Sequence, residues 1–132
     1  MKRLTPILLL LLLWPAGPVF GQQDPAAIPN GLQGTQRIDA LNRLAAQNLT
    51  NQPASAAEWA GEALQLSEGQ SYDAGIATAA RLLSIYERDR SRYSRATRLA
   101  EQSAAAAQRA GLRDQVLEAY QLLQMLGQLR NR

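Results

Sequence analysis

Residues 79–100, AARLLSIYERDRSRYSRATRLA, decide the fold of this 132-residue chain. Up to Tyr86 the apolar residues recur at spacings of three or four, which is typical of one face of a helix. A charged turn follows, and a second apolar stripe then runs from Tyr93 through Ala96 to Ala100. Because the connection between the two helices is short, the stretch predicts an antiparallel helical hairpin.

Helical periodicity extends over most of the chain on both sides of this hairpin. Ala, Leu, Gln, Arg and Glu are abundant, whereas Val, Ile, Thr and the aromatic residues are sparse, and this balance favours an all-α fold over a sheet. The five expected helices begin near Thr35, Pro53, Tyr72, Tyr93 and Arg113.

A repeat of about 40 residues relates these helices, with two helices in each unit. Three comparisons indicate this repeat, and the sequence interval between matched residues differs slightly among them. One is the single match between Leu44 and Leu82, and the other two are sets of four matches. The first set pairs Ala56, Trp59, Ala60 and Ala63 with Ala96, Leu99, Ala100 and Ser103. The second set, whose interval is longer by one, pairs Asp73, Ile76, Ala79 and Leu82 with Asp114, Leu117, Tyr120 and Leu123.

The opening stretch resembles the tetratricopeptide repeat family in the pattern Ala79-x-x-Leu82-Leu83-x-x-Tyr86, followed by Tyr93-x-x-Ala96-x-x-x-Ala100. The long period is most similar to the longer bacterial variety of this repeat. The resemblance implies a short right-handed α-solenoid of stacked antiparallel hairpins over residues 35–130, with about five helices and two and a half repeats.

The resemblance also implies a concave surface, lined by the first helix of each repeat, that holds a protein or peptide partner. This surface lacks the Lys and Arg set with which some members of the family clamp a C-terminal carboxylate. The positions carried over to this chain are Asp39, Asn42 and Ala46, then Ala77, Ala80, Ser84 and Glu87, then Glu118, Gln121, Met125 and Gln128.

The composition excludes most catalytic chemistry. Cys and His are both absent, so disulfides, thiol nucleophiles, imidazole bases and the usual zinc sites are excluded. Glu58 and Glu62 lie one helical turn apart, but such a pair on an Ala-rich helix is usually a solvated face. We therefore expect no enzyme and no cofactor, although a small hydrolase with an unrecognised site remains an alternative.

Residues 1–21 have the order of a secretory signal peptide. Lys2 and Arg3 precede the apolar run Ile7–Trp14, and compact residues lead to an expected cleavage between Gly21 and Gln22. An uncleaved anchor is the alternative. We expect an exported bacterial protein, periplasmic or secreted, that meets the membrane only through this leader. Residues 22–34, with two prolines and two glycines, are expected to form a flexible linker.

Charge is divided unevenly along the chain after the leader. Residues 22–80 hold two Arg and six acidic residues, a net charge of −4, whereas residues 81–132 hold ten Arg and five acidic residues, a net charge of +5. The overall charge of these two parts is only +1, so nucleic acid is not an expected partner. Five arginines concentrate near one turn, where they either pair with local acids, which is the more common arrangement, or bind an acidic partner: Arg88, Arg90, Arg92, Arg95 and Arg98.

The fifth helix carries two apolar stripes. Val116, Tyr120 and Leu123 are expected to cover the fourth helix, and a second stripe of Leu122, Leu126 and Leu129 is expected to face water. The second stripe predicts a weak homo-oligomer, or contact with a partner helix. The expected function is that of an exported, non-catalytic interaction or scaffolding module. The alternative is the periplasmic input segment of a truncated membrane sensor kinase or similar signalling protein.

Overall fold

The computed structural model describes residues 28–132, and over this range the chain forms five α-helices and no strand. The all-α prediction is therefore confirmed, and the expected signal peptide lies outside the described residues. None of the helices in this range is long and apolar enough to cross a membrane. The helices are α2 (Gly34–Asn48), α3 (Pro53–Gly69), α4 (Asp73–Asp89), α5 (Tyr93–Ala110) and α6 (Arg113–Arg130).

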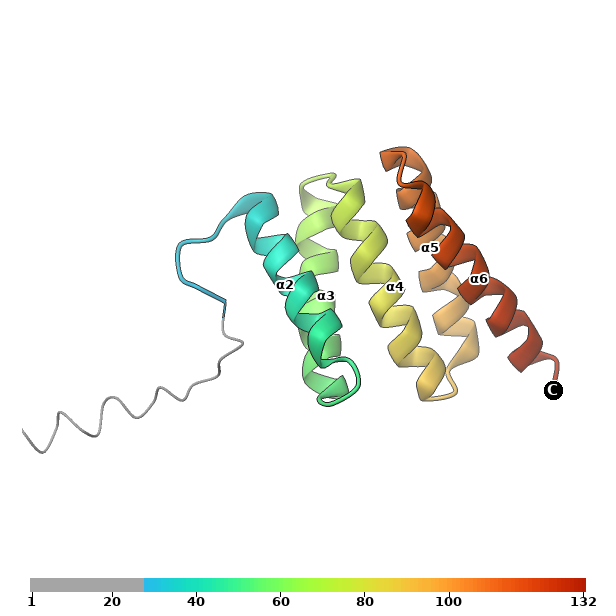
Figure 1. The fold of residues 1–132 in the computed structure, drawn as a ribbon. Coiled ribbons are helices and arrows are strands. Elements are labelled where there is room, and N and C mark those ends of the chain that lie inside the picture. Colours follow the sequence, from blue (N-terminus) through green and yellow to red (C-terminus); the bar gives the residue numbers. More distant parts are fainter. Residues whose placement is uncertain (1–27) are drawn as a thin grey trace, which may run out of the picture.

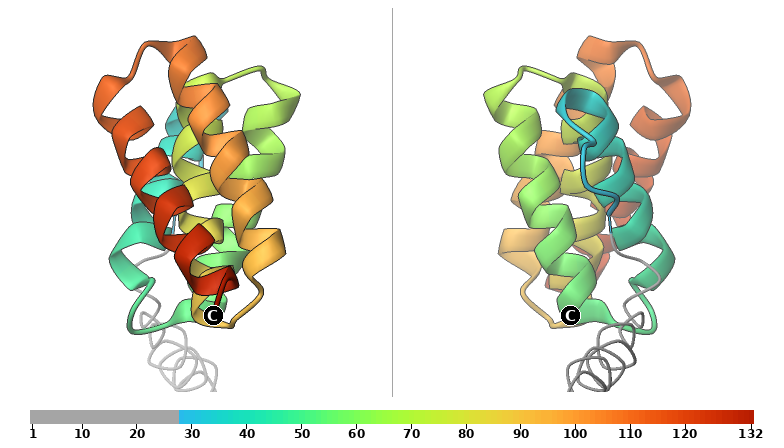
Figure 2. Two further views of the ribbon diagram at one scale, coloured as in Figure 1. Left: turned by 90° about the vertical axis from the view of Figure 1, so that its right-hand side faces the viewer. Right: turned by 90° about the vertical axis from the view of Figure 1, so that its left-hand side faces the viewer.

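The five helices form two layers. In Figure 1, α2, α4 and α6 lie side by side at the front, and α3 and α5 lie behind them. The side views of Figure 2 separate the layers, with α3 and α5 on one side and α2 and α6 on the other. Each helix packs against the next in the chain, and α4 also contacts both α2 and α6.

Three of the four turns share one geometry. Each has a residue in the left-handed region, Ser71 (φ 54°), Ser91 (φ 62°) or Gly111 (φ 71°). The next N–H then donates to a carbonyl five residues earlier at 2.9 Å, as in the Schellman motif. The residue that donates this bond also serves as the N-cap of the following helix. A single compact turn therefore ends one helix and starts the next.

The repeated turn gives the chain a regular spacing. The helices α3, α4, α5 and α6 begin at equal intervals along the sequence, at Pro53, Asp73, Tyr93 and Arg113. The predicted match of Ala56 in α3 with Ala96 in α5 is confirmed, because both alanines lie three positions after the start of their helix.

The predicted match between α4 and α6 is wrong by one residue. Since α4 and α6 begin at Asp73 and Arg113, the equivalent of Asp73 is Arg113 and not Asp114. The predicted match of Leu44 in α2 with Leu82 in α4 agrees with the burial of both residues, since each is almost fully buried.

Small residues fill the space between the layers. Ala60 in α3 and Ala100 in α5 are almost fully buried. Two buried serines also help, because the Ser84 hydroxyl donates to the carbonyl of Ala96 and the Ser103 hydroxyl to that of Ala77, each at 2.7 Å. These hydroxyls satisfy their own hydrogen bonds while they allow α4 and α5 to approach closely.

The N-terminal segment before α2 is not entirely separate from the core. Residues 28–33 are not helical, and Ile28 packs against the buried cluster that contains Ile38 and Leu41. The remainder of the expected linker, residues 22–27, lies outside the described part of the chain.

Candidate interaction surface

The outward side of α2, α4 and α6 forms one continuous surface, here called the α2–α4–α6 face. On α4 its members follow spacings of three and four and are partly exposed, and its members on α2 and α6 are exposed. Side-chain contacts join α4 to α6 along this surface, from Thr78 to Gln115 and from Arg81 to Glu118. The face consists of Asp39 and Ala46 on α2, Ala74, Thr78, Arg81, Ile85 and Arg88 on α4, and Glu118, Gln121, Met125 and Gln128 on α6.

The binding residues predicted on α4 are wrong, because the structure buries them. Ala77, Ala80, Ser84 and Glu87 are buried, because this side of α4 packs against α5 and its connecting turn. The exposed positions are each one residue further along the helix, and one residue turns a helix by about 100°. On α2, Asn42 is also buried, and its Nδ2 donates to the carbonyl of Gly75 at 3.2 Å. These five residues are not available to a partner.

Half-buried arginines mark the boundary between α4 and α6. The Nε of Arg81 lies 3.3 Å from the carboxylate of Glu118, an ion pair that is not aligned as a hydrogen bond. The guanidinium of Arg88 pairs with Asp89 at 2.9 Å and reaches the sulfur of Met125 at 3.3 Å. Both arginine stems lie along the face, so the face combines charge with apolar surface.

A tyrosine joins α2 to α4 at the other boundary of the face. The hydroxyl of Tyr72 donates to Asp39 at 2.9 Å. Burial raises the pKa of Tyr72, and the hydrogen bond to Asp39 and its negative charge raise this pKa further. The phenol therefore stays protonated as a hydrogen-bond donor well into the alkaline range.

The five arginines near the α4–α5 turn do not form a single patch. Glu87 is buried between Arg92 and Arg95, with oxygen-to-nitrogen distances of 3.4 and 3.7 Å. The guanidinium of Arg90 lies 5.1 Å from the centre of the Tyr86 ring. Arg88 faces α6, and Arg98 is exposed without an ion pair among residues 28–132. Local partners thus occupy most of this arginine run.

The second apolar stripe predicted on α6 does not face water, and the first packs inward only in part. Leu122 and Leu126 are buried against Ala96 and Ala100, and Leu129 is half-buried, so this stripe does not face water. Tyr120 was expected to cover α5, but it is 48% exposed. Val116 and Leu123 do pack inward. The prediction is therefore wrong for the second stripe and for Tyr120.

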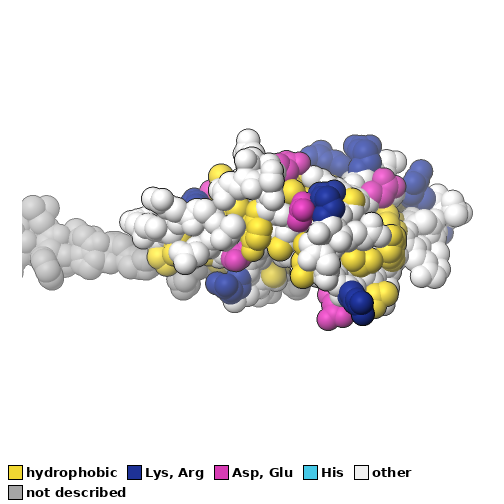
Figure 3. Space-filling model, turned by 90° about the horizontal axis from the view of Figure 1, so that it is seen from above, with side chains coloured by type: hydrophobic (Ala, Val, Ile, Leu, Met, Phe, Trp, Pro, Cys, Tyr) yellow, Lys and Arg dark blue, Asp and Glu magenta, His cyan; other side chains and the backbone are white. Residues whose placement is uncertain are grey.

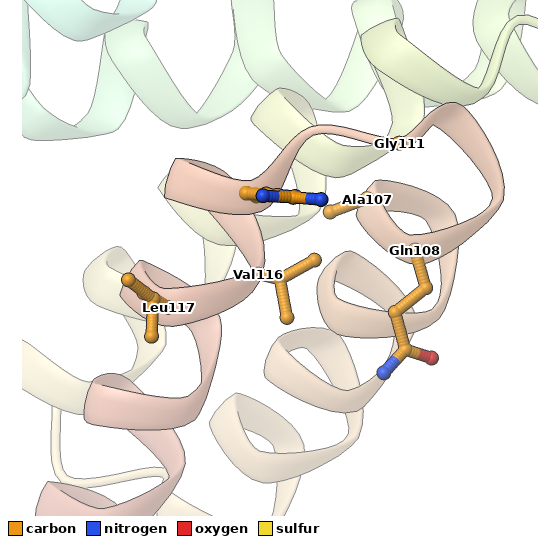
Figure 4. Close-up of a pocket in the computed structure, with 6 residues that line it drawn as sticks. Ala107, Gln108, Gly111, Val116 and Leu117 are labelled. Atoms are coloured by element: carbon orange, nitrogen blue, oxygen red, sulfur yellow. The ribbon is translucent and has the colours of Figure 1, made fainter.

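A shallow apolar hollow of about 440 Å³ lies beside the α5–α6 turn. In Figure 4, Val116 points toward α5 and Leu117 lies further out on α6. Viewed from the end that carries this turn (Figure 3), apolar side chains are exposed among charged ones, and basic side chains gather on the half that holds α5 and α6. The hollow is lined by Ala107, Gln108, Gly111, Arg113, Val116 and Leu117.

The two carboxylates that lie one helical turn apart on α3, Glu58 and Glu62, have different surroundings. Glu62 forms a 2.7 Å ion pair with Arg37 of α2, whereas Glu58 is exposed. Over residues 28–132 no group of three or more acidic side chains is placed to hold a metal ion.

Comparison with known proteins adds no family to this description. No family model matches the chain, and no curated protein or solved structure matches it.

Proposed function

We propose that this chain is an exported, non-catalytic module of tetratricopeptide type that binds a protein or peptide partner. The observation that carries the proposal is the repeated turn at Ser71, Ser91 and Gly111, which recurs at equal intervals along the chain. Stacking of such units as a right-handed solenoid accounts for alternate helices on one side. The first helices of successive hairpins then share a continuous surface, the α2–α4–α6 face.

The composition of this face favours a partner with both apolar and polar side chains. Ile85 and Met125 supply apolar contact, and Gln121 and Gln128 supply hydrogen-bonding groups. Arg81 and Arg88 already have acidic neighbours, at Glu118 and Asp89. A free carboxylate on a partner would compete with these ion pairs, so the proposed partner contacts the face through an internal segment and not through its C-terminus.

A matched pair of exposed alanines tests this assignment. Ala46→Arg places a long charged side chain on the α2–α4–α6 face, whereas Ala105→Arg places the same side chain on the opposite layer, on α5. We expect Ala46→Arg to weaken partner binding at least about tenfold and Ala105→Arg to leave it unchanged. The measurement is quantitative capture from a periplasmic extract, followed by titration of the captured protein.

Both substitutions lie on exposed positions, so each is expected to change the stability by less than about 0.5 kcal/mol. Equal thermal midpoints for the two variants provide the control. Capture of the same proteins by both variants, with equal affinity, would contradict the assignment of the binding face.

Export has its own test. The protein produced from the whole coding sequence in a bacterial host should begin at Gln22, because the leader has the charged, apolar and cleavage segments of a signal peptide. Intact-mass measurement of the periplasmic fraction checks the position, including the mass loss from a cyclised N-terminal glutamine. Recovery of a membrane-bound chain that retains Met1 would reject cleavage.

A further inference from the structure

The outermost side of α6 has no counterpart packed against it within the described chain. Leu117, Tyr120, Gln124 and Gly127, spaced three and four residues apart, form one stripe along this side, here called the α6 seam. All four are exposed, with Leu117 at 60% and Tyr120 at 48%.

The repeat shows what such a stripe does elsewhere in this protein. In the preceding repeat, the equivalent positions on α4 are buried where α4 packs against α5 and the turn that precedes it. The helix α5 thus covers on α4 the side that is uncovered on α6. These equivalent positions are Ala77, Ala80, Ser84 and Glu87.

We propose that the α6 seam is a dimerisation surface on which α6 of a second copy packs in the antiparallel direction, about a two-fold axis near Leu122. This register places Leu117 level with Gly127 of the second copy, because each lies five residues from the axis. Tyr120 is level with Gln124 of the second copy in the same way. The surface is self-complementary, as a two-fold contact requires.

Shape selects the second copy as the occupant. A Cβ added at Gly127 would meet no atom within 4 Å, so the space above this residue is open. A glycine inside a helix destabilises it by about 0.5–1 kcal/mol relative to alanine, and it permits close approach of another chain. Leu117 of the second copy fills that space. A parallel pair would instead place Leu117 against Leu117 and leave a gap at Gly127.

Charge selects the same direction. No charged residue occurs from Ala119 to Leu129, so the middle of the seam is desolvated without burying an ion. At the start of α6 the charges of Arg113 and Asp114 cancel and Glu118 pairs with Arg81, whereas Arg130 and Arg132 near its end sum to +2. Antiparallel packing keeps the two pairs of arginines apart, whereas parallel packing brings four arginines together.

One seam side chain is already held in position. The hydroxyl of Tyr120 accepts a hydrogen bond from Nε2 of Gln108 on α5 at 2.7 Å. Fixing the ring in the monomer lowers the conformational entropy lost on association. With only four seam residues from each copy, the contact is at the small end of specific interfaces, and we expect a dissociation constant of about micromolar or weaker.

Because the chain contains no cysteine, engineered disulfides give an unambiguous test of the register. The double variant Leu117→Cys/Gly127→Cys, in the whole chain, should form a covalent dimer under mild oxidation. Within one helix these positions are about 15 Å apart and cannot bridge. Each single variant should remain a monomer on a non-reducing gel, because an antiparallel pair separates identical positions by the same distance. A covalent dimer of Leu117→Cys alone, or none from the double variant, would overturn the proposal.

A matched pair of substitutions tests the contact without cross-linking. Leu117→Glu should raise the dissociation constant measured by sedimentation equilibrium at least about tenfold. Ala105→Glu adds the same charge at an exposed position of α5, off the seam, and should change this constant less than about twofold. An unmodified protein that stays monomeric at high concentration would also overturn the proposal. Because neither Leu117 nor Ala105 belongs to the α2–α4–α6 face, this assay is independent of the partner binding proposed above.

Discussion

Replacement of Leu126 by alanine should lower the free energy of unfolding by about 2–5 kcal/mol. Leu126 is fully buried and packs against Ala96, Ala100 and Leu122, so the truncation leaves a cavity between α5 and α6. The small alanines opposite have no longer side chain with which to fill that space. Urea unfolding followed by far-ultraviolet circular dichroism measures the loss.

The matched control is Leu117→Ala on the same helix. Leu117 is 60% exposed, so its truncation should change the stability by less than about 0.5 kcal/mol. Both variants are compared at a protein concentration well below the dissociation constant of the dimer, so that the seam contact does not contribute. Equal losses for the two leucines would mean that α6 packs in a different rotation.

A second large effect is expected at Gly75, in the first turn of α4, which packs against α2 and α3. A Cβ at this position would overlap the hydroxyl of Ser67 and lie 2.7 Å from the Tyr72 ring and 2.8 Å from Ile38. Gly75→Ala should therefore destabilise the protein by about 1–3 kcal/mol, because three packed groups have to move. Thermal and urea unfolding provide the measurement.

Another helical glycine provides the control for backbone entropy. A Cβ at Gly61 in α3 meets no atom within 4 Å, so Gly61→Ala should stabilise the protein by about 0.4–1 kcal/mol. The opposite signs separate crowding from helix propensity. Ser67→Ala removes the nearest atom, a buried hydroxyl without a hydrogen-bond partner, and should recover part of the loss when combined with Gly75→Ala. Strict additivity of the two substitutions would argue against the close contact.

Much of the helical framework was predictable from the amino-acid pattern. The number of helices follows from the spacing of apolar residues, and the match of Ala56 and Ala60 with Ala96 and Ala100 is confirmed by the starts of α3 and α5. This match follows from the spacing of Ala56 and Ala60 in α3, which is the same as that of Ala96 and Ala100 in α5. Three of the four α2–α4–α6 face positions predicted on α6, Glu118, Gln121 and Gln128, are polar as well as exposed.

The rotation of α4 and α6 was not predictable in the same way. Apolar residues occur on several sides of α6, including Leu117, Tyr120, Leu122 and Leu126, so a shift of one residue also gives a plausible apolar stripe. Hydropathy alone does not distinguish the correct alignment of α4 with α6 from the one displaced by a single residue. Each residue of shift turns the assigned side by about 100°. That rotation placed the expected binding residues of α4 on its buried side.

The amino-acid pattern by itself determined the helical class, the five helices and the small residues that let them pack closely. The tertiary structure alone decided which side of α4 and of α6 is buried. Its decisive element is the turn, where Ser71 and Ser91 adopt a backbone conformation that usually indicates glycine and therefore carry no strong local signal. The i−5 hydrogen bonds and the packing of the flanking helices stabilise that conformation, and they set the equal helix spacing that positions both the α2–α4–α6 face and the α6 seam.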